Sequence, residues 1–226
     1  MRILFFLFLF LLPSISYAAS AYLVDDGGVI EAKKLQIENW YSHSSTGENI
    51  YVSNPAYQIF TNAEFAVQET YTSSGANNTL WPQLKYLIHK GEGIWSSVTA
   101  GVNYSSTDSG IYGNYLYSST TKRLNKIVDL NIYVGWQNWR HAIGNNKSTD
   151  FLNYGLGSEV HLTNDFSLIG EFFQTNGQLR NGPKAPAIQA ATRYIATHYL
   201  VLDLIYGRNI NGNHNDWVTF GAAVVF

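Results

Sequence analysis

The sequence predicts an all-β fold, an antiparallel up-and-down transmembrane β-barrel of about twelve strands. Two observations lead to this prediction: apolar and polar residues alternate in runs of roughly ten residues, and an apolar segment begins the chain. A period of two places alternate side chains on opposite faces of a strand, so that one face meets an apolar medium and the other does not.

The last strand shows the alternation clearly. Counting back from Phe226, every second residue of 217–226 is apolar. A final strand that ends in an aromatic residue is similar to the closing strand of bacterial outer-membrane barrels, and predicts that the barrel assembly machinery recognises Phe226. An edge strand of a soluble β-protein is the alternative.

The beginning of the chain indicates export. A basic start at Met1–Arg2 precedes the apolar run 3–12, and Pro13 ends that run. This pattern predicts a signal peptide over 1–21, with cleavage near residue 18 or 21. An uncleaved anchor is disfavoured because the run is shorter than the roughly 20 residues of a spanning helix. Residues 22–226 are expected to form a single barrel domain.

The composition excludes several classes of protein. The chain has 226 residues, no cysteine, 13% charged residues and a formal net charge of −2. Disulfide scaffolds and thiolate metal sites are excluded, and the charge gives no basis for a nucleic-acid partner. No apolar run long enough for a spanning helix follows residue 21. Outer-membrane lipids are the expected surroundings.

The strands follow from the alternation and from the turns between them. Clear alternation covers 80–88, 94–104, 128–137, 152–162, 200–206 and 217–226. Weaker candidates are 33–42, 50–61, 63–72, 110–120, 166–174 and 186–196, and Pro55 requires a bulge or break in the second of them. From a periplasmic N-terminus, short turns and long outer loops should alternate. Two segments depart from this rule: the turn 121–127 is too long, and the outer loop 106–109 is too short.

Aromatic residues recur near the expected strand ends, and membrane barrels carry two such girdles at the headgroup level. The girdle candidates are Trp40, Tyr41, Trp81, Trp95, Tyr104, Trp136, Trp139, Phe166, Tyr199 and Trp217. Ordinary core aromatics are the alternative.

Three short stretches carry a family resemblance. They are Val24–Val29, which continues through Lys33–Lys34 to Glu38, then Asn54–Tyr57, and Trp81–Tyr86. This series resembles the outer-membrane family labelled putative meta-pathway of phenol degradation, which is related to the long-chain fatty acid transporter superfamily. The resemblance implies uptake of small, often hydrophobic or aromatic molecules.

Charged residues on the polar faces are the candidate solute-binding residues. They should point into the lumen, because Arg or Lys facing lipid at mid-bilayer costs about 2–4 kcal/mol. The candidates are Lys34, Glu38, Lys85, Asp129, Glu159, Glu171, Arg193 and Asp203. Internal ion pairs that only hold the barrel closed are the alternative role.

The sequence gives little support for catalysis. Glu159 and His161 could form a metal-ligand pair, but no third ligand follows at a known spacing. No nucleophile motif is present, and Gly155-Leu156-Gly157 suits close packing inside the barrel better than a dinucleotide site. We therefore expect no cofactor, no metal and no enzyme activity. The leading hypothesis is a channel or transporter for a small-molecule solute; a plugged structural or recognition barrel and an outer-membrane hydrolase are the alternatives.

Overall fold

A computed structural model describes residues 22–74, 78–105, 110–140, 148–174, 186–211 and 214–226. The predicted signal peptide, both cleavage positions and the loop 106–109 lie outside the described residues. Within the described residues, no helix is long and apolar enough to cross a membrane.

The described residues form twelve β-strands that run in chain order. Their bounds are β1 Leu35–Ser44, β2 Asn49–Phe60, β3 Ala63–Thr72, β4 Thr79–Gly91, β5 Ile94–Ser105, β6 Gly110–Arg123, β7 Val128–Arg140, β8 Ser148–His161, β9 Phe166–Gln174, β10 Ala187–Thr197, β11 Leu200–Asn209 and β12 Asp216–Val225.

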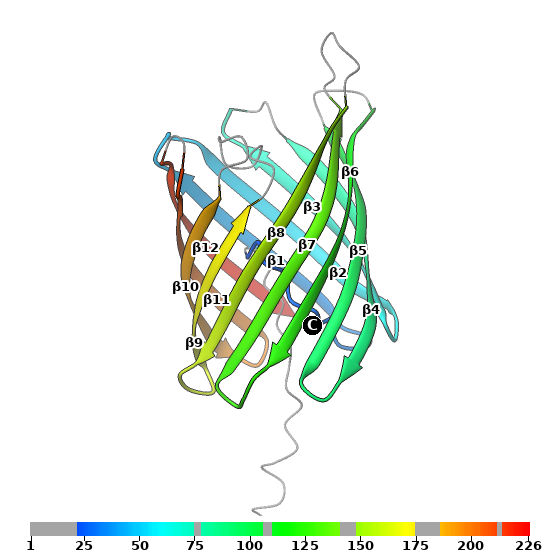
Figure 1. Ribbon diagram of the computed structural model, residues 1–226, viewed down its shortest axis with the longest axis vertical. Helices are drawn as coiled ribbons and strands as arrows, with labels where there is room; N and C mark the ends of the chain where they lie inside the picture. The colour runs from blue at the N-terminus through cyan, green and yellow to red at the C-terminus, as the bar shows by residue number, and fades with distance from the viewer. Residues whose placement is uncertain (1–21, 75–77, 106–109, 141–147, 175–185, 212–213) are drawn as a thin grey trace, which may run out of the picture.

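The strands form one closed antiparallel barrel in which each pairs with its neighbours in sequence (Figure 1). Pairing of β1 with β12 closes it, from Gln36 opposite Val225 to Ser44 opposite Trp217. At the closing end, Phe226 donates its N–H to the Leu35 carbonyl at 2.8 Å. Closure leaves no strand with an unpaired edge, as a sheet within a lipid bilayer requires.

The predicted strands and turns are largely confirmed. The weaker candidates are strands too, and the long turn at 121–127 shortens to 124–127 because β6 continues to Arg123. Pro55 lies in β2 without a bulge: its pairing with β1 is unbroken, while the register with β3 skips 54–55 and resumes unshifted. Proline has no N–H to donate, which accounts for a local gap in the ladder.

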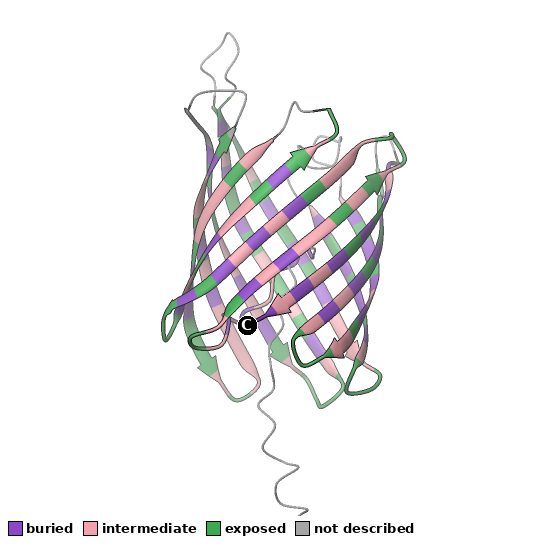
Figure 2. Ribbon diagram, turned by 180° about the vertical axis from the view of Figure 1, so that it is seen from behind, coloured by how far each residue is buried: buried purple, intermediate pink, exposed green. Residues whose placement is uncertain are grey.

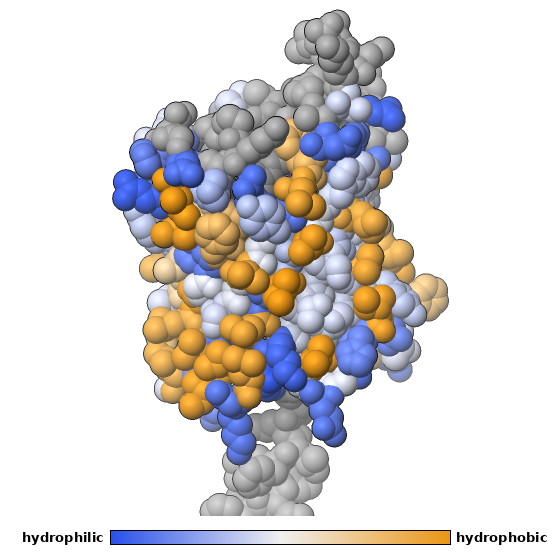
Figure 3. All heavy atoms as spheres, viewed as in Figure 1, coloured by the Kyte–Doolittle hydropathy of each residue, from blue (hydrophilic) through white to orange (hydrophobic). Residues whose placement is uncertain are grey.

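The two faces of the barrel differ as the alternation predicts. Along most of the strands, buried residues alternate with intermediate or exposed ones (Figure 2). The exposed face carries large apolar side chains, including Ile132, Leu152, Leu156 and Leu204. Figure 3 shows such residues gathered on the outer surface, with hydrophilic residues near both ends. This is the surface of a barrel that is solvated by lipid.

The girdle prediction is wrong for half of its members. Tyr41, Tyr104, Trp136 and Tyr199 are exposed on the outside. The rings that instead belong to the lumen are Trp40, Trp81, Trp95, Trp139 and Trp217. Nearness to a strand end determines where a ring lies along the barrel axis, but not whether it points outward or inward. These five residues occupy the same alternate positions as the polar residues that point into the lumen.

Candidate functional site

The residues before β1 lie inside the barrel. This inner segment, Tyr22–Glu31, crosses the lumen before the chain reaches β1 (Figure 1, dark blue). Tyr22, Val24 and Ile30 are each less than 10% exposed. The segment therefore belongs to the interior of the barrel and occupies part of the lumen.

One end of the inner segment is held by β9, β10 and β11. The Tyr22 hydroxyl donates to Asp203 at 3.0 Å, and the Arg193 guanidinium lies 4.8 Å from the centre of the Tyr22 ring. Burial raises the pKa of the Tyr22 hydroxyl well above its ordinary value, so this group remains a hydrogen-bond donor. The backbone N–H groups of Leu23 and Val24 donate to Glu171 at 3.2 and 3.3 Å.

The middle of the inner segment is held by β4 and β6. Lys85 lies 3.0 Å from the Asp25 carboxylate and 3.7 Å from Asp26. The Tyr117 hydroxyl also donates to Asp25, at 3.0 Å. Burial raises the pKa of Asp25, and the Lys85 ammonium opposes that shift. A buried lysine needs such partners, because an isolated charge in the interior is costly.

Two glycine positions allow the segment to lie against the wall. The Gly27 N–H donates to Thr121 at 2.9 Å, and a Cβ at Gly27 would lie 2.0 Å from the Trp95 carbonyl oxygen. A Cβ at Gly155 of β8 would lie 2.6 Å from a methyl carbon of Val24. The prediction that Gly155 serves close packing inside the barrel is confirmed.

The inner segment separates two cavities in the lumen. The upper chamber lies on the side of the long loops and has a volume of about 180 Å³. The lower chamber lies on the side of the short turns and measures about 770 Å³. Ile30 lines both chambers, so the partition is thin at that point. Short turns face the periplasm in outer-membrane barrels, which makes the lower chamber the periplasmic one.

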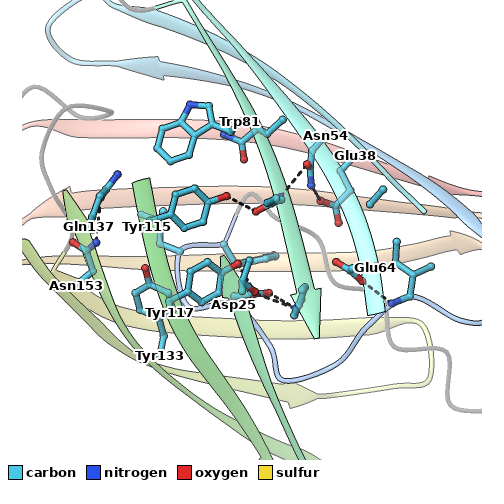
Figure 4. A pocket seen from close by; sticks show the side chains of 18 of the residues that line it. Asp25, Glu38, Asn54, Glu64, Trp81, Tyr115, Tyr117, Tyr133, Gln137 and Asn153 are labelled. Atoms are coloured by element: carbon cyan, nitrogen blue, oxygen red, sulfur yellow. Dashed lines mark hydrogen bonds and ion pairs between the residues drawn. The ribbon is translucent and has the colours of Figure 1, made fainter. Parts of the chain in front are cut away.

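The upper chamber has an aromatic wall and a polar wall (Figure 4). The aromatic wall, from β4, β6 and β7, comprises Trp81, Tyr115, Tyr117, Tyr133 and Trp139. The polar groups that line the chamber from the barrel wall are Gln36, Glu38, Asn54, Glu64, Gln68, Gln83, Lys85, Thr99, Gln137 and Asn153. Asp25 of the inner segment lies between the two walls.

The lower chamber is lined by paired charges. Arg123 binds Asp129 through two contacts of 2.9 Å, and His161 contacts the same carboxylate at 3.2 Å. Arg193 lies 3.0 Å from Asp203 and 3.5 Å from Glu159. Most of these pairs join neighbouring strands around the turn-side half of the lumen, and Arg193–Glu159 connects β10 with β8 across β9.

Seven of the eight predicted site residues lie on strand faces that point into the lumen. Glu38 and Lys85 line the upper chamber, while Asp129, Glu159 and Arg193 line the lower one. Two others hold the inner segment, namely Glu171 and Asp203. Lys34 directly precedes β1 and pairs at 3.1 Å with Glu31, which lines the lower chamber. His161 and Glu159 are neighbours, yet the described residues hold no group of three potential metal ligands.

The sequence patterns did not predict that the inner segment and the aromatic wall belong to the site. The parity of Tyr133, Gln137 and Trp139 on one strand could have revealed the wall, since all three share one face. Nothing in the local pattern of Val24–Gly28 predicts that it lies inside the barrel, because its contacts are with residues far away in the sequence.

The sequence and the fold were compared with known proteins. A family of uncharacterised conserved proteins, UCP029691, matches residues 6–226. The chain belongs to this family. No curated protein matches the chain in sequence.

The fold is similar to solved outer-membrane porins. The NanC porin shares 11% identity over 83% of this chain and 98% of its own, with a TM-score of 0.66. The KdgM porin, solved in complex with disordered oligogalacturonate, shares 8% identity over 84% of this chain and 99% of its own, with a TM-score of 0.66. An outer-membrane channel from Pseudomonas putida F1 shares 13% identity over 88% of this chain and 97% of its own, with a TM-score of 0.58.

These findings correct the family prediction and locate the protein. Membership of the phenol-degradation family and of the fatty acid transporter superfamily is wrong, because the matching family is UCP029691 and the similar structures are small porins. The motif residues make structural contacts that do not require membership of that family: Asp25 pairs with Lys85, and Gly27 packs against Trp95. The porin fold and the apolar outer face make this a protein of the bacterial outer membrane.

Proposed function

We propose that this chain is an outer-membrane channel for small polar solutes, and that the inner segment forms its constriction. The observation that carries the proposal is the pair of cavities on opposite sides of that segment, which share Ile30 as a common wall. A solute would enter the upper chamber, pass the segment and leave through the lower chamber.

The lining favours polar over hydrophobic solutes. Side-chain amides and carboxylates project into the upper chamber, and buried polar groups are costly without hydrogen-bond partners. A hydrocarbon would displace water from those groups without forming hydrogen bonds to them. Hydrophobic or aromatic solutes, which the motif resemblance implied, are therefore not part of the proposal.

Charge disfavours anions in the upper chamber. Among the described residues that line it, Asp25, Glu38 and Glu64 are acidic and Lys85 is basic. A narrow pathway with excess fixed negative charge repels anions and concentrates cations. The oligogalacturonate seen with KdgM is a polyanion, so we do not extend that ligand to this chain.

A plugged barrel is the second candidate function, because the inner segment is strongly anchored. The Asp25–Lys85 ion pair, the Tyr22–Asp203 hydrogen bond and the Gly27–Thr121 hydrogen bond tie it to different parts of the wall. If these contacts never open, the lumen carries no solute and the barrel serves as scaffold or receptor.

Single-channel recordings of the protein in planar bilayers separate the two candidates. The channel proposal expects step conductance from the unaltered protein. Lys85→Met should raise that conductance, because it removes the cation that holds Asp25 and Asp26. Lys122→Met, at an exposed position on β6, is the matched control. A silent native protein that conducts only as Lys85→Met would establish the plugged barrel instead.

A further inference from the structure

The aromatic wall of the upper chamber is a continuous row of rings. Trp81 lies with its centroid 5.4 Å from that of Tyr115 and 5.7 Å from that of Trp139. Tyr115 stacks on Tyr117 at 6.0 Å, and Tyr117 lies 5.0 Å from Tyr133. Ring faces carry partial negative charge, so such a wall attracts C–H groups that carry partial positive charge.

A chain of hydrogen bonds links this wall to the polar one. The Tyr115 hydroxyl donates to Gln83 at 2.8 Å, the Gln83 amide donates to Asn54 at 3.4 Å, and Asn54 donates to Glu38 at 3.1 Å. A glutamine side chain has two N–H donors and two acceptor lone pairs. The described contacts of Gln83 use one of each, which leaves a donor and an acceptor for a ligand.

These features favour one class of ligand. We propose, resting on the channel function above, that the upper chamber binds an uncharged, polyhydroxylated ring of about the size of one sugar unit. The C–H face of the ring would lie on Trp81 and Tyr115, and its hydroxyl groups would exchange hydrogen bonds with Gln83, Asn54 and Glu38.

The aromatic wall and the polar groups disfavour other classes of ligand. A flat hydrocarbon would lie well on the rings but would displace water from the amides and from Glu38 without forming hydrogen bonds to them. An acidic sugar would meet Asp25, Glu38 and Glu64, against a single ammonium among the described lining residues. An amino sugar could gain from the carboxylates, so it is the informative competitor.

Glucose, glucuronate and glucosamine form a matched probe set, because they share ring size and differ in charge. Each is added to the protein in a planar bilayer, and the block of ion current is titrated. We expect saturable block by glucose and no saturable block by glucuronate. Block by glucosamine should be no tighter than block by glucose.

Two variants test the wall directly. Trp81→Ala and Gln83→Leu should each weaken block by glucose about tenfold, which corresponds to roughly 1.4 kcal/mol. Trp136→Ala, on the outer face of β7, is the matched control and should leave the block unchanged. Heat-modifiable migration on gels verifies that each variant still forms a barrel.

The outcomes separate this inference from the function on which it rests. Absence of any ion current contradicts the channel function itself. Current that is blocked equally by glucose and glucuronate, or block that survives Trp81→Ala and Gln83→Leu, overturns the sugar-ring site alone. Markedly tighter block by glucosamine would replace it with a site for organic cations.

Discussion

The upper and lower chambers belong to one lumen but are built from different chemistry. The upper chamber joins aromatic rings and amides to a small excess of carboxylates, whereas the lower chamber is lined by paired charges such as Arg123 with Asp129. In the upper chamber the ring faces need no hydrogen-bond partner, and the Gln83 amide keeps one donor and one acceptor beyond its bonds to Tyr115 and Asn54. Paired charges are already satisfied, so they stabilise the wall rather than bind. We therefore propose that the upper chamber recognises the solute and that the lower one supports the wall.

The largest expected effect tests the structural role of the lower chamber. Arg193→Met should destabilise the barrel by about 3–5 kcal/mol, because the buried Asp203 and the partly buried Glu159 would lose their cation. Arg208→Met removes an exposed pair with Asp216 and should cost no more than about 1 kcal/mol. Urea unfolding of both variants in lipid vesicles measures the difference. Equal losses of unfolding free energy in the two variants would mean that the ion pairs of the lower chamber stabilise the barrel no more than an exposed pair does.

Sided labelling tests whether the inner segment separates the chambers. The chain has no cysteine, so single cysteines report cleanly. Asn54→Cys, in the upper chamber, should react faster with a bulky impermeant thiol reagent added from the loop side. Asn131→Cys, in the lower chamber, should react faster from the turn side. Leu130→Cys faces lipid and should react slowly from both. Equal rates from both sides would show that the segment is no barrier.

A substitution at Gly27 tests the close packing of the inner segment. Gly27→Val should displace the segment and raise conductance, because even a Cβ would lie 2.0 Å from the Trp95 carbonyl oxygen. Gly170→Ala is the control, since no atom lies within 4 Å of its added carbon. Single-channel conductance compares the two. Unaltered conductance of Gly27→Val would indicate that the constriction lies elsewhere.

The smallest expected effect concerns ion selectivity. Glu38→Gln should lower the preference for cations, because it removes one of the carboxylates that give the upper chamber its net charge. Glu159→Gln should change the preference less, since the lower chamber also holds Arg123, Arg193 and Lys90. Reversal potentials in a potassium chloride gradient measure both. A larger change for Glu159→Gln would assign selectivity to the lower chamber.

The alternation along the strands predicts which side chains point into the lumen, but it does not predict which of them contact one another. The alternation in 128–137 places Asp129 and Tyr133 on one face and Leu130 on the other, as the structure has them. The pairing of Arg193 with Asp203 requires the register of β10 on β11, which local periodicity leaves open. The contact of Lys34 with Glu31 likewise depends on the inner segment, which precedes β1 and is not part of the alternating pattern.

The sequence by itself determined the twelve strands, their turns and the two faces, because alternation and turn residues are local properties of the chain. Only the tertiary structure placed Tyr22–Glu31 inside the lumen, where this segment separates the upper chamber from the lower one. The contacts that hold this segment join residues far apart in sequence, such as Tyr22 with Asp203, 181 positions away, and Asp25 with Lys85, 60 positions away. They exist only once the barrel has closed and removed these groups from water, because the closed wall then supplies the partners that buried polar groups require.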